Sequence, residues 1–340
     1  MSYNLIDEPW IPVERRGGEK DWIRPWQITD HTQKNVPAAV GLNATRPDFD
    51  GALLQFLIGL VQTALLPARD REWRRHLQNP PSPEALRTAF SDWRHAFDLN
   101  GDGPRFQQDL DRIPEAKEKP ISYLLVDSPS DNALRENKDH FVKDRSHQRY
   151  CSACTAAALQ TLQVNAPQGG RGHRTSLRGG GPVSTVITGR SLWHTIWLNV
   201  LPRSTYGEEI EEEETVFPWL APTRTSEDGS VTTPEDGHPL QVYWGMPRRL
   251  YLGKPEEKGT CDLCGREAEQ RYGRYRTTSH GVNYEGGWEH PLTPHRVTDN
   301  GELRPFHSRQ EGFSYRYWRG LAAGRSSENT RSAQVVQAFY

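Results

Sequence analysis

Two pairs of cysteines that lie far apart in the chain constrain its fold more than any other feature. The 340 residues contain only four cysteines, Cys151 with Cys154 and Cys261 with Cys264, and both pairs have CxxC spacing. Two thiolates separated by two residues can bind one metal ion, and two such pairs complete a tetrahedral site of the structural zinc type. Gly265 follows the second pair and suits a tight turn. Four thiolates leave no open coordination position, so the pattern predicts a structural Zn²⁺ and not a catalytic one.

Redox chemistry and disulfide formation are the other uses of paired cysteines. The strand and the βα unit that frame a thioredoxin-type CxxC are missing around both pairs. Disulfides belong to oxidising compartments, whereas residues 1–20 contain four acidic residues and no long apolar run, so we expect a cytoplasmic protein without a signal peptide. A shared zinc ion would close residues 155–260 into a long loop and hold that loop against the segment after Cys264.

The charge of the chain is small overall but unevenly distributed. The net charge is −2, yet residues 155–207 contain five arginines and neither Asp nor Glu, and a run of glutamates follows at 208–214. Phosphate binding is a local electrostatic event, so a segregated basic segment matters more than the total charge. The acid-free segment is therefore the predicted nucleic-acid contact, and the glutamate run is interpreted as a solvated loop.

A glycine-arginine stretch, QGGRGHR at 168–174, is the most informative part of that segment. Glycines have no Cβ, so the backbone can approach a groove closely, and arginine adds a planar fork for phosphates or base edges. The stretch predicts a loop that lies in a DNA minor groove; an ordinary flexible turn is the alternative. The predicted DNA-binding residues of this region are Gln168, Gly169, Gly170, Arg171, Gly172, Arg174 and Arg178.

Two other functions remain open from the residues alone. No GxxxxGK[ST], GxSxG or HExxH motif occurs. His280, His290 and His295 with Asn283 suggest a zinc-dependent nuclease of the His-Asn-His type. Their spacing forms no clear ββ-metal unit, and solvated or core histidines are the favoured interpretation. A zinc-stabilised scaffold that binds RNA is the third possibility.

The apolar pattern predicts a mixed α+β fold, a large irregular domain in which helices surround short mixed sheets. The strongest helix covers 45–66; Gln55, Gly59 and Gln62 interrupt its apolar run, which is short for a membrane span, so we expect a core helix and no membrane partner. Further helices are expected over 71–78, from 82, and over 154–165, 191–201 and 331–340. Strands are expected within 3–13, 21–28, 121–126, 183–188 and 241–253, and a basic hairpin within 271–284.

These motifs together resemble the large subunit, CasA, of the type I-E CRISPR Cascade surveillance complex. They occur in the family's order and cover nearly the whole chain. The matching segments are NLIDEPWIPV at 4–13, CTAAAL at 154–159, APQGGRGHRTSLRGGGPV at 166–183, WGMPRRL at 244–250 and GWEHPLTP at 287–294.

The resemblance implies a subunit without enzymatic activity that acts in antiviral defence. Members of the family recognise the protospacer-adjacent motif in double-stranded DNA from the minor groove, start strand separation and help to recruit a helicase-nuclease. The implied partners are target DNA, the guide RNA and other Cascade subunits. Guided effectors in general leave sequence choice to RNA pairing, while the protein reads a short duplex motif.

Carried over by position, the family's glycine loop falls on Gln168 to Gly172, with Arg171 where a glycine is usual. The family's motif-contacting lysine falls near Ser279, so that contact is lost or taken by Arg276 or His280. A loop that docks near the 5′ end of the guide RNA falls within Leu125 to Arg149.

The resemblance also implies a domain organisation. Residues 1–340 correspond to the family's N-terminal large domain: 1–150 with strands, helices and the docking loop, 151–264 as the zinc-closed segment with the DNA loop, and 265–340 as a basic hairpin and tail. The family continues into a strand-separating wedge and a four-helix bundle, which we expect beyond Tyr340. The chain is then truncated, or a shortened form whose missing part another subunit supplies.

Overall fold

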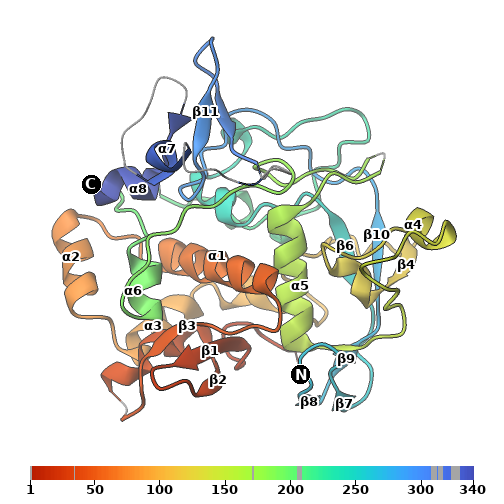
Figure 1. Cartoon of the computed structure of the whole chain (residues 1–340), viewed down its shortest axis with the longest axis horizontal. Coiled ribbons are helices and arrows are strands. Elements are labelled where there is room, and N and C mark those ends of the chain that lie inside the picture. Colours follow the sequence, from red (N-terminus) through yellow and green to blue (C-terminus); the bar gives the residue numbers. More distant parts are fainter. Residues whose placement is uncertain are drawn as a thin grey trace.

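The computed structural model describes residues 2–33, 35–170, 172–204, 209–307, 312, 317–322 and 330–340. Two long helices, α1 (Pro47–Ala64) and α5 (Ser152–Asn165), pack against each other at the centre, and short sheets and helices surround them (Figure 1). The predicted mixed α+β class is confirmed.

From Ala52 to Thr63 helix α1 is buried on nearly all its faces, which explains why this part of its sequence is largely apolar. Pro47 begins the helix, and Asp50 in the first turn accepts a hydrogen bond from the backbone N–H of Ala44 at 2.8 Å. Buried Gln62 exchanges two hydrogen bonds with the backbone of Leu201, at 2.7 and 2.9 Å. In the part of the chain that the structure describes, no helix is both long and apolar enough to cross a bilayer.

An aromatic cluster surrounds Phe56 of α1. Its ring meets Trp10, Phe97, Phe106 and Trp244 edge-on, with centroids 4.9 to 5.8 Å apart. Such pairs each add about 0.5–1.5 kcal/mol beyond the area that they bury. The cluster joins the N-terminal segment, the segment after α3 (Pro83–Ser91) and the segment before β6 (Arg249–Leu252) to one central helix.

The strands form small antiparallel sheets. The first sheet has the order β2 (Lys20–Ile23), β1 (Ile11–Arg15), β3 (Ala39–Leu42), and the second β4 (Lys117–Pro120), β10 (Arg274–Thr278), β6 (Arg249–Leu252). The third has the order β12 (Leu303–Pro305), β11 (His295–Val297), β13 (Thr330–Arg331). Two-stranded ladders join β5 (Tyr150–Cys151) to β9 (Arg271–Tyr272) and β7 (Gly259–Thr260) to β8 (Glu267–Ala268).

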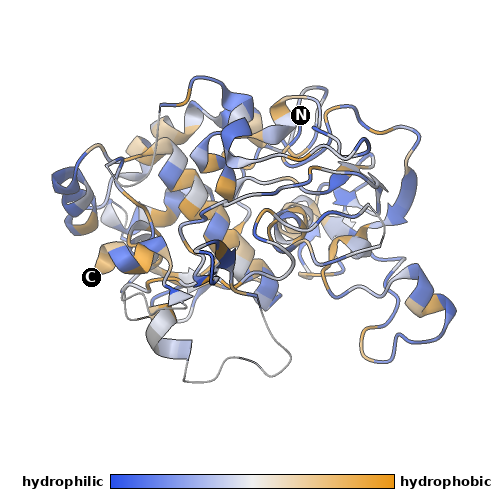
Figure 2. Cartoon of the chain, turned by 90° about the horizontal axis from the view of Figure 1, so that it is seen from above, coloured by the Kyte–Doolittle hydropathy of each residue, from blue (hydrophilic) through white to orange (hydrophobic). Residues whose placement is uncertain are grey.

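Shorter helices cover these sheets and the central pair. The α-helices are α2 (Asp70–Gln78), α3 (Pro83–Ser91), α4 (Asp131–Arg135), α6 (Leu192–Trp197), α7 (Trp318–Ala322) and α8 (Gln334–Phe339). The 3₁₀ turns are η1 (Pro25–Thr32), η2 (Arg94–Phe97), η3 (Ile121–Leu124), η4 (Glu213–Thr215), η5 (Pro218–Leu220), η6 (Pro234–Asp236) and η7 (Pro239–Tyr243). Figures 1 and 2 both show the segment around α4 projecting from one edge and the hydrophilic α2 at the opposite edge.

Most predicted helices are confirmed, but several predicted strands are wrong. Residues 121–124 form the 3₁₀ turn η3, and residues 183–188, all of them described, form no strand. The latter segment is extended, but its N–H groups bond irregularly, from Val183 to the carbonyl of Phe306 and from Thr185 to that of Leu292. Within 241–253 only β6 is a strand. The predicted hairpin at 271–284 is also wrong, because β9 pairs with β5 while β10 pairs with β4 and β6.

Candidate metal centre and nucleic-acid interface

The first cysteine pair lies where β5 passes into α5. Cys151 is the N-cap of the helix, and its Sγ accepts a hydrogen bond from the backbone N–H of Cys154 at 3.4 Å. Helix N-termini carry a partial positive charge, which favours thiolates. The pair is therefore held by a helix start, not by the tight turn that holds the second pair.

The second pair lies in the turn between β7 and β8. Gly265 has φ +73°, a conformation that glycine adopts without strain. Its N–H donates to the carbonyl of Cys261 at 2.9 Å, and the N–H of Cys261 donates to the carbonyl of Arg266 at 2.8 Å. The turn that Gly265 predicts from the sequence is confirmed.

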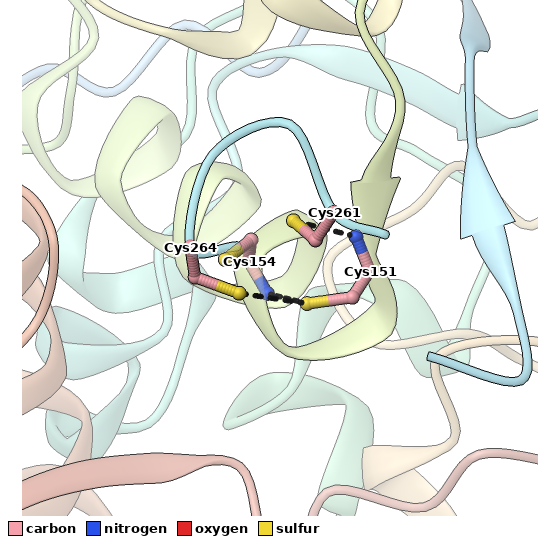
Figure 3. Close-up of side chains that lie close together, drawn as sticks. All are labelled: Cys151, Cys154, Cys261 and Cys264. Carbon is pink, nitrogen blue, oxygen red and sulfur yellow. Dashed lines mark hydrogen bonds between the residues drawn. The ribbon is translucent and has the colours of Figure 1, made fainter. Parts of the chain in front are cut away.

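The four sulfurs meet at one point, as Figure 3 shows. All of them lie within 4.8 Å of one another, and the Sγ atoms of Cys151 and Cys264 are 3.8 Å apart. In a tetrahedral site with Zn–S bonds of about 2.3 Å, the sulfurs are about 3.8 Å apart. The backbone N–H of Cys151 also donates to the Sγ of Cys261 at 3.2 Å, which suits a thiolate. The residues present therefore fit a metal ion held by sulfur alone.

The four thiols of the cluster differ in exposure and in pKa. Cys151, Cys154 and Cys261 are buried, and Cys264 is partly exposed. Hydrogen bonds from Cys151 and Cys154 lower the pKa of Cys261 and bring that of Cys264 to about 7, whereas the pKa values of Cys151 and Cys154 are raised by hydrogen bonds within the cluster and by burial. Among the described residues, no other group of three or more His, Cys, Asp or Glu side chains is arranged to hold a metal.

Direct protein contacts join the same two segments beside the cysteines. The backbone N–H of Arg149 donates to the carboxylate of Asp262 at 2.6 Å, and the N–H of Asp262 returns a bond to the carbonyl of Arg149 at 2.9 Å. The Arg149 guanidinium also pairs with Glu256 at 2.5 Å. We call the four cysteines together with Arg149, Asp262 and Glu256 the cysteine junction.

Helix α5 carries the cysteine junction at its start and the glycine loop, Gln168 to Gly172, after its end. Its 14 residues span roughly 20 Å. Gln163 in its last turn exchanges two hydrogen bonds with the backbone of Arg248, both at 3.0 Å. A guanidinium nitrogen of Arg248 then bonds the carbonyl of Pro167, which fixes the first residues of the loop.

The glycine loop lies directly against the end of β10. The carbonyl of Gly172 accepts a hydrogen bond from the N–H of His280 at 2.7 Å. A Cβ placed on Gly172 would lie 2.8 Å from the Cβ of Ser279, and Gly172 has φ +77°, so only glycine fits without strain. The structure thus brings the predicted loop and Ser279 together. Arg171 lies outside the described residues.

Arg174 and His280 are held by one further loop. The Nε of Arg174 donates to the Ser226 hydroxyl at 2.8 Å, and that hydroxyl donates to the carbonyl of Gly281 at 2.7 Å. His280 has a positive φ of 60°. A Cβ on Gly281 would lie 2.0 Å from the carbonyl oxygen of Pro247, so this crossing of two backbones requires glycine.

Arg276 lies on β10 with its side chain opposite the buried Tyr275 and is half-exposed. Glu118 is its neighbour across β4. Within the described ranges, neither Arg174 nor Arg276 forms an ion pair with a carboxylate. Arg174, which follows the glycine loop in the chain, therefore has no carboxylate partner among the described residues, and Arg276 lies on the face of β10 that it shares with Glu118.

Arg178 is an internal residue. Its side chain is 3% exposed and donates to the hydroxyls of Ser184 and Thr293, at 2.9 and 3.0 Å, and to the side-chain oxygen of Gln55 at 2.6 Å. Burial lowers its pKa to about 9. Its guanidinium has no surface to offer a duplex, which counts against the predicted DNA contact, so the interface that we propose below leaves Arg178 out.

The histidines of the nuclease interpretation are not assembled into a site. His290 is 2% exposed, its Nδ1 accepts the N–H of Leu292 at 3.1 Å, and its ring meets Tyr243 edge-on at 5.0 Å. Burial lowers the pKa of His290 well below its usual value and that of His295 to about 4. Asn283 donates to Glu285 at 2.9 Å. His290 and His295 are core histidines, and the nuclease interpretation loses its support.

Two features of the site escaped the sequence analysis. Arg248 and Arg249 form a charge doublet, but among the described residues only Arg249 has carboxylate partners, Asp109 and Asp111. Nothing local in the sequence distinguishes the arginine that stays unpaired. Phe141 is 101% exposed in the segment around α4, where a lone aromatic in a polar stretch is the only signal.

Fold and site together define a mixed α+β protein whose two cysteine pairs meet in one cluster that could hold a metal ion, and whose exposed glycine loop is followed by Arg174, which has no carboxylate partner among the described residues. A family model described as CRISPR-associated protein Cse1 matches residues 4–340. The chain belongs to this Cse1 family, and the resemblance to CasA is confirmed at that level.

Solved structures of the family share the fold. The chain is similar to Cse1 from Acidimicrobium ferrooxidans at 21% identity and a TM-score of 0.71, over 99% of this chain and 63% of that one. It is similar to Thermus thermophilus CasA (Cse1) at 21% identity and a TM-score of 0.68, over 99% and 66%. A chain of a CRISPR RNA-guided surveillance complex matches at 18% identity and a TM-score of 0.65, over 98% and 68%. The chain spans less than two-thirds of the length of these Cse1 structures.

Proposed function

We propose that this chain is the DNA-sensing large subunit of an RNA-guided type I-E Cascade complex. It recognises the protospacer-adjacent motif in double-stranded DNA, promotes strand separation and helps to recruit the helicase-nuclease. The observation that carries the proposal is the glycine loop held against Ser279 and His280, followed by Arg174, which has no carboxylate partner among the described residues.

The chemistry of this surface suits a duplex. Gly169, Gly170 and Gly172 present backbone without side chains, which permits close approach to the minor-groove floor. Arginines without a carboxylate partner are free to exchange counterions for phosphate contacts. Arg171 would add a further cation to the same loop. Arg276 or His280 replaces the lysine that the family uses near Ser279.

A structural Zn²⁺ in the cysteine junction would hold this surface in place. Four thiolates fill its coordination sphere, so the ion would act by cross-linking and not by chemistry on a substrate. We accordingly propose that the chain acts by binding, without enzymatic activity of its own.

The segment around α4 is proposed to contact the guide RNA and other Cascade subunits. Phe141 projects from it fully exposed, among polar neighbours. A fully exposed aromatic side chain suits stacking on an unpaired base or insertion into a partner's pocket.

Salt-dependent binding tests the DNA contact. In the assembled complex, R174A with R276A is expected to weaken binding of duplex targets and to flatten the plot of log affinity against log salt by about 2, since each phosphate contact contributes about 0.9. The matched control is R71A with R74A on α2, two exposed arginines at the opposite edge of the molecule (Figure 1).

An unchanged slope in the R174A, R276A complex would overturn the proposed interface. An equal loss in the α2 control would show that only bulk charge matters. Competition with single-stranded RNA separates the proposal from an RNA-binding scaffold, which RNA would saturate and duplex DNA would not.

A further inference from the structure

A cavity of about 280 Å³ lies between the glycine loop and the segment that leads into α4. One wall is formed by Gly169, Gly170 and His173, and the opposite wall by Tyr123 and residues 128–131. Strands β4, β6 and β10 supply Lys119, Leu250, Tyr275 and Thr277. The volume is close to the lower end of the ~300–1,000 Å³ range of ligand pockets, so the cavity suits one small group.

Aromatic and cationic side chains meet in this cavity. The half-buried Tyr123 places its phenol ring at the lining, the ammonium of Lys119 lies 5.4 Å from the centroid of that ring, and Tyr275, which is 5% exposed, adds little open surface. Tyr rings are the surfaces on which unstacked bases pack, and the stacking tolerates any base. The lining therefore offers a platform for a flat ring.

Polar groups with different preferences complete the lining. Arg248 uses one guanidinium nitrogen on Pro167, and its Nε has no acceptor in the described part of the chain, so donor capacity remains for a phosphate. Asp131, which pairs with Lys119, offers carboxylate oxygens to the amino groups of a base edge. The cavity thus offers Arg248 to a phosphate, Asp131 to the edge of a base and the Tyr123 ring to its face.

Resting on the function proposed above, we infer that this cavity receives one unstacked nucleotide of a single strand. Its base packs against the ring of Tyr123, its edge is read by Asp131, and its phosphate binds Arg248. The position explains the choice of ligand, because one wall belongs to the proposed duplex-contacting loop and the other to the proposed RNA-docking segment. An unpaired nucleotide arises at the guide RNA end and, after strand separation, in the target DNA.

Fluorescent base substitution tests the inference in the assembled complex. The fluorescent base 2-aminopurine is placed singly at each unpaired position near the 5′ end of the guide RNA, and in a second series at each position of the adjacent DNA motif. We expect one position to change in intensity. Y123A should abolish the change and weaken the local contact at least about fivefold, whereas Y123F should retain it.

The two series identify the source of the nucleotide. A response only in the RNA series assigns the cavity to the guide, and a response only in the DNA series assigns it to the target. No response at any position in a complex that still binds duplex, or a response that survives Y123A, overturns the inference and leaves the proposed function intact. A wild-type complex that binds no duplex overturns the proposed function instead.

A second measurement uses the wild-type protein, so it tests the inference even if Y123A fails to fold. The same positions carry 4-thiouridine or 4-thiothymidine, and the cross-linked peptides are identified by mass spectrometry. Adducts on Tyr123, His173 or Tyr275 support the cavity, and adducts confined to exposed residues such as Phe141 contradict it.

Discussion

The cysteine junction and the glycine loop lie at the two ends of α5, and both join this helix to later parts of the chain. They differ in whether their polar groups have partners within the protein. In the junction, sulfurs accept backbone N–H groups, and Arg149 is fully engaged with Asp262 and Glu256. At the glycine loop, Arg174 has no carboxylate partner in the described structure, and the Nε of Arg248 has no hydrogen-bond acceptor there. The cysteine junction therefore stabilises the fold, and the glycine loop keeps hydrogen-bond donors available for a binding partner.

The largest expected effect on stability comes from removing the cysteines of the cysteine junction. C261S with C264S should abolish metal binding and destabilise the chain by about 4 kcal/mol or more, since closing a loop of about 100 residues stabilises by that amount in the chain-entropy model. Denaturant unfolding with metal analysis measures it. Wild-type protein treated with a chelator should show the same loss of stability as the double variant. A double variant that keeps both its metal and its unfolding midpoint would contradict the stabilising role of the cysteine junction.

The pH dependence of stability tests whether His295 is buried in the core, as the structure shows. Burial lowers the pKa of His295 in the folded state to about 4, whereas the ordinary pKa of histidine is about 6.5. The unfolded chain therefore binds more protons between these values, so stability is complete above about pH 6.5 and falls by about 3 kcal/mol as the pH drops through this window.

H295N should remove this part of the pH dependence of the melting temperature. The measurement is made in excess zinc, so that release of the metal does not contribute. H140N is the control, because His140 is exposed and its replacement should leave the profile unchanged. A profile that H295N leaves as steep as before would contradict the assignment.

Within the loop, two neighbouring glycines should differ. G172A should cost about 1–2 kcal/mol, since its backbone has a positive φ and a Cβ would lie 2.8 Å from Ser279. In G170A the new Cβ would meet only His173, at 3.9 Å, so stability should change by less than about 0.5 kcal/mol. Equal unfolding midpoints for the two variants would show that the loop is not seated against β10.

The smallest effect on stability is expected at the projecting segment. F141S should change the free energy of unfolding by less than about 0.5 kcal/mol, because Phe141 buries nothing in the isolated chain. Its association with the assembled complex should weaken, as measured by co-purification with the guide RNA. D139N is the control, because it changes a neighbouring residue and leaves the aromatic side chain of Phe141 in place. A large loss of stability in F141S would place this side chain in a core.

Local patterns determined the parts of this protein that depend on local chemistry. CxxC spacing with Gly265 identified the four sulfur ligands, and helical periodicity with Pro47 identified α1. Both signals arise within a few residues. The predicted strands at 121–126 and 183–188 failed because β-branched and aromatic residues also fit extended or 3₁₀ segments, and only distant partners decide which of these forms.

Tertiary structure alone decided which arginines are available. Arg174, Arg178, Arg248 and Arg276 look equivalent in the sequence, but Arg178 is bonded inside the core and Arg276 is unpaired. Whether a charge is free depends on the carboxylates and backbone groups that folding brings near it. The cavity beside the glycine loop has the same origin, since its walls come from segments that lie apart in the chain and meet because α5 and β10 hold them together.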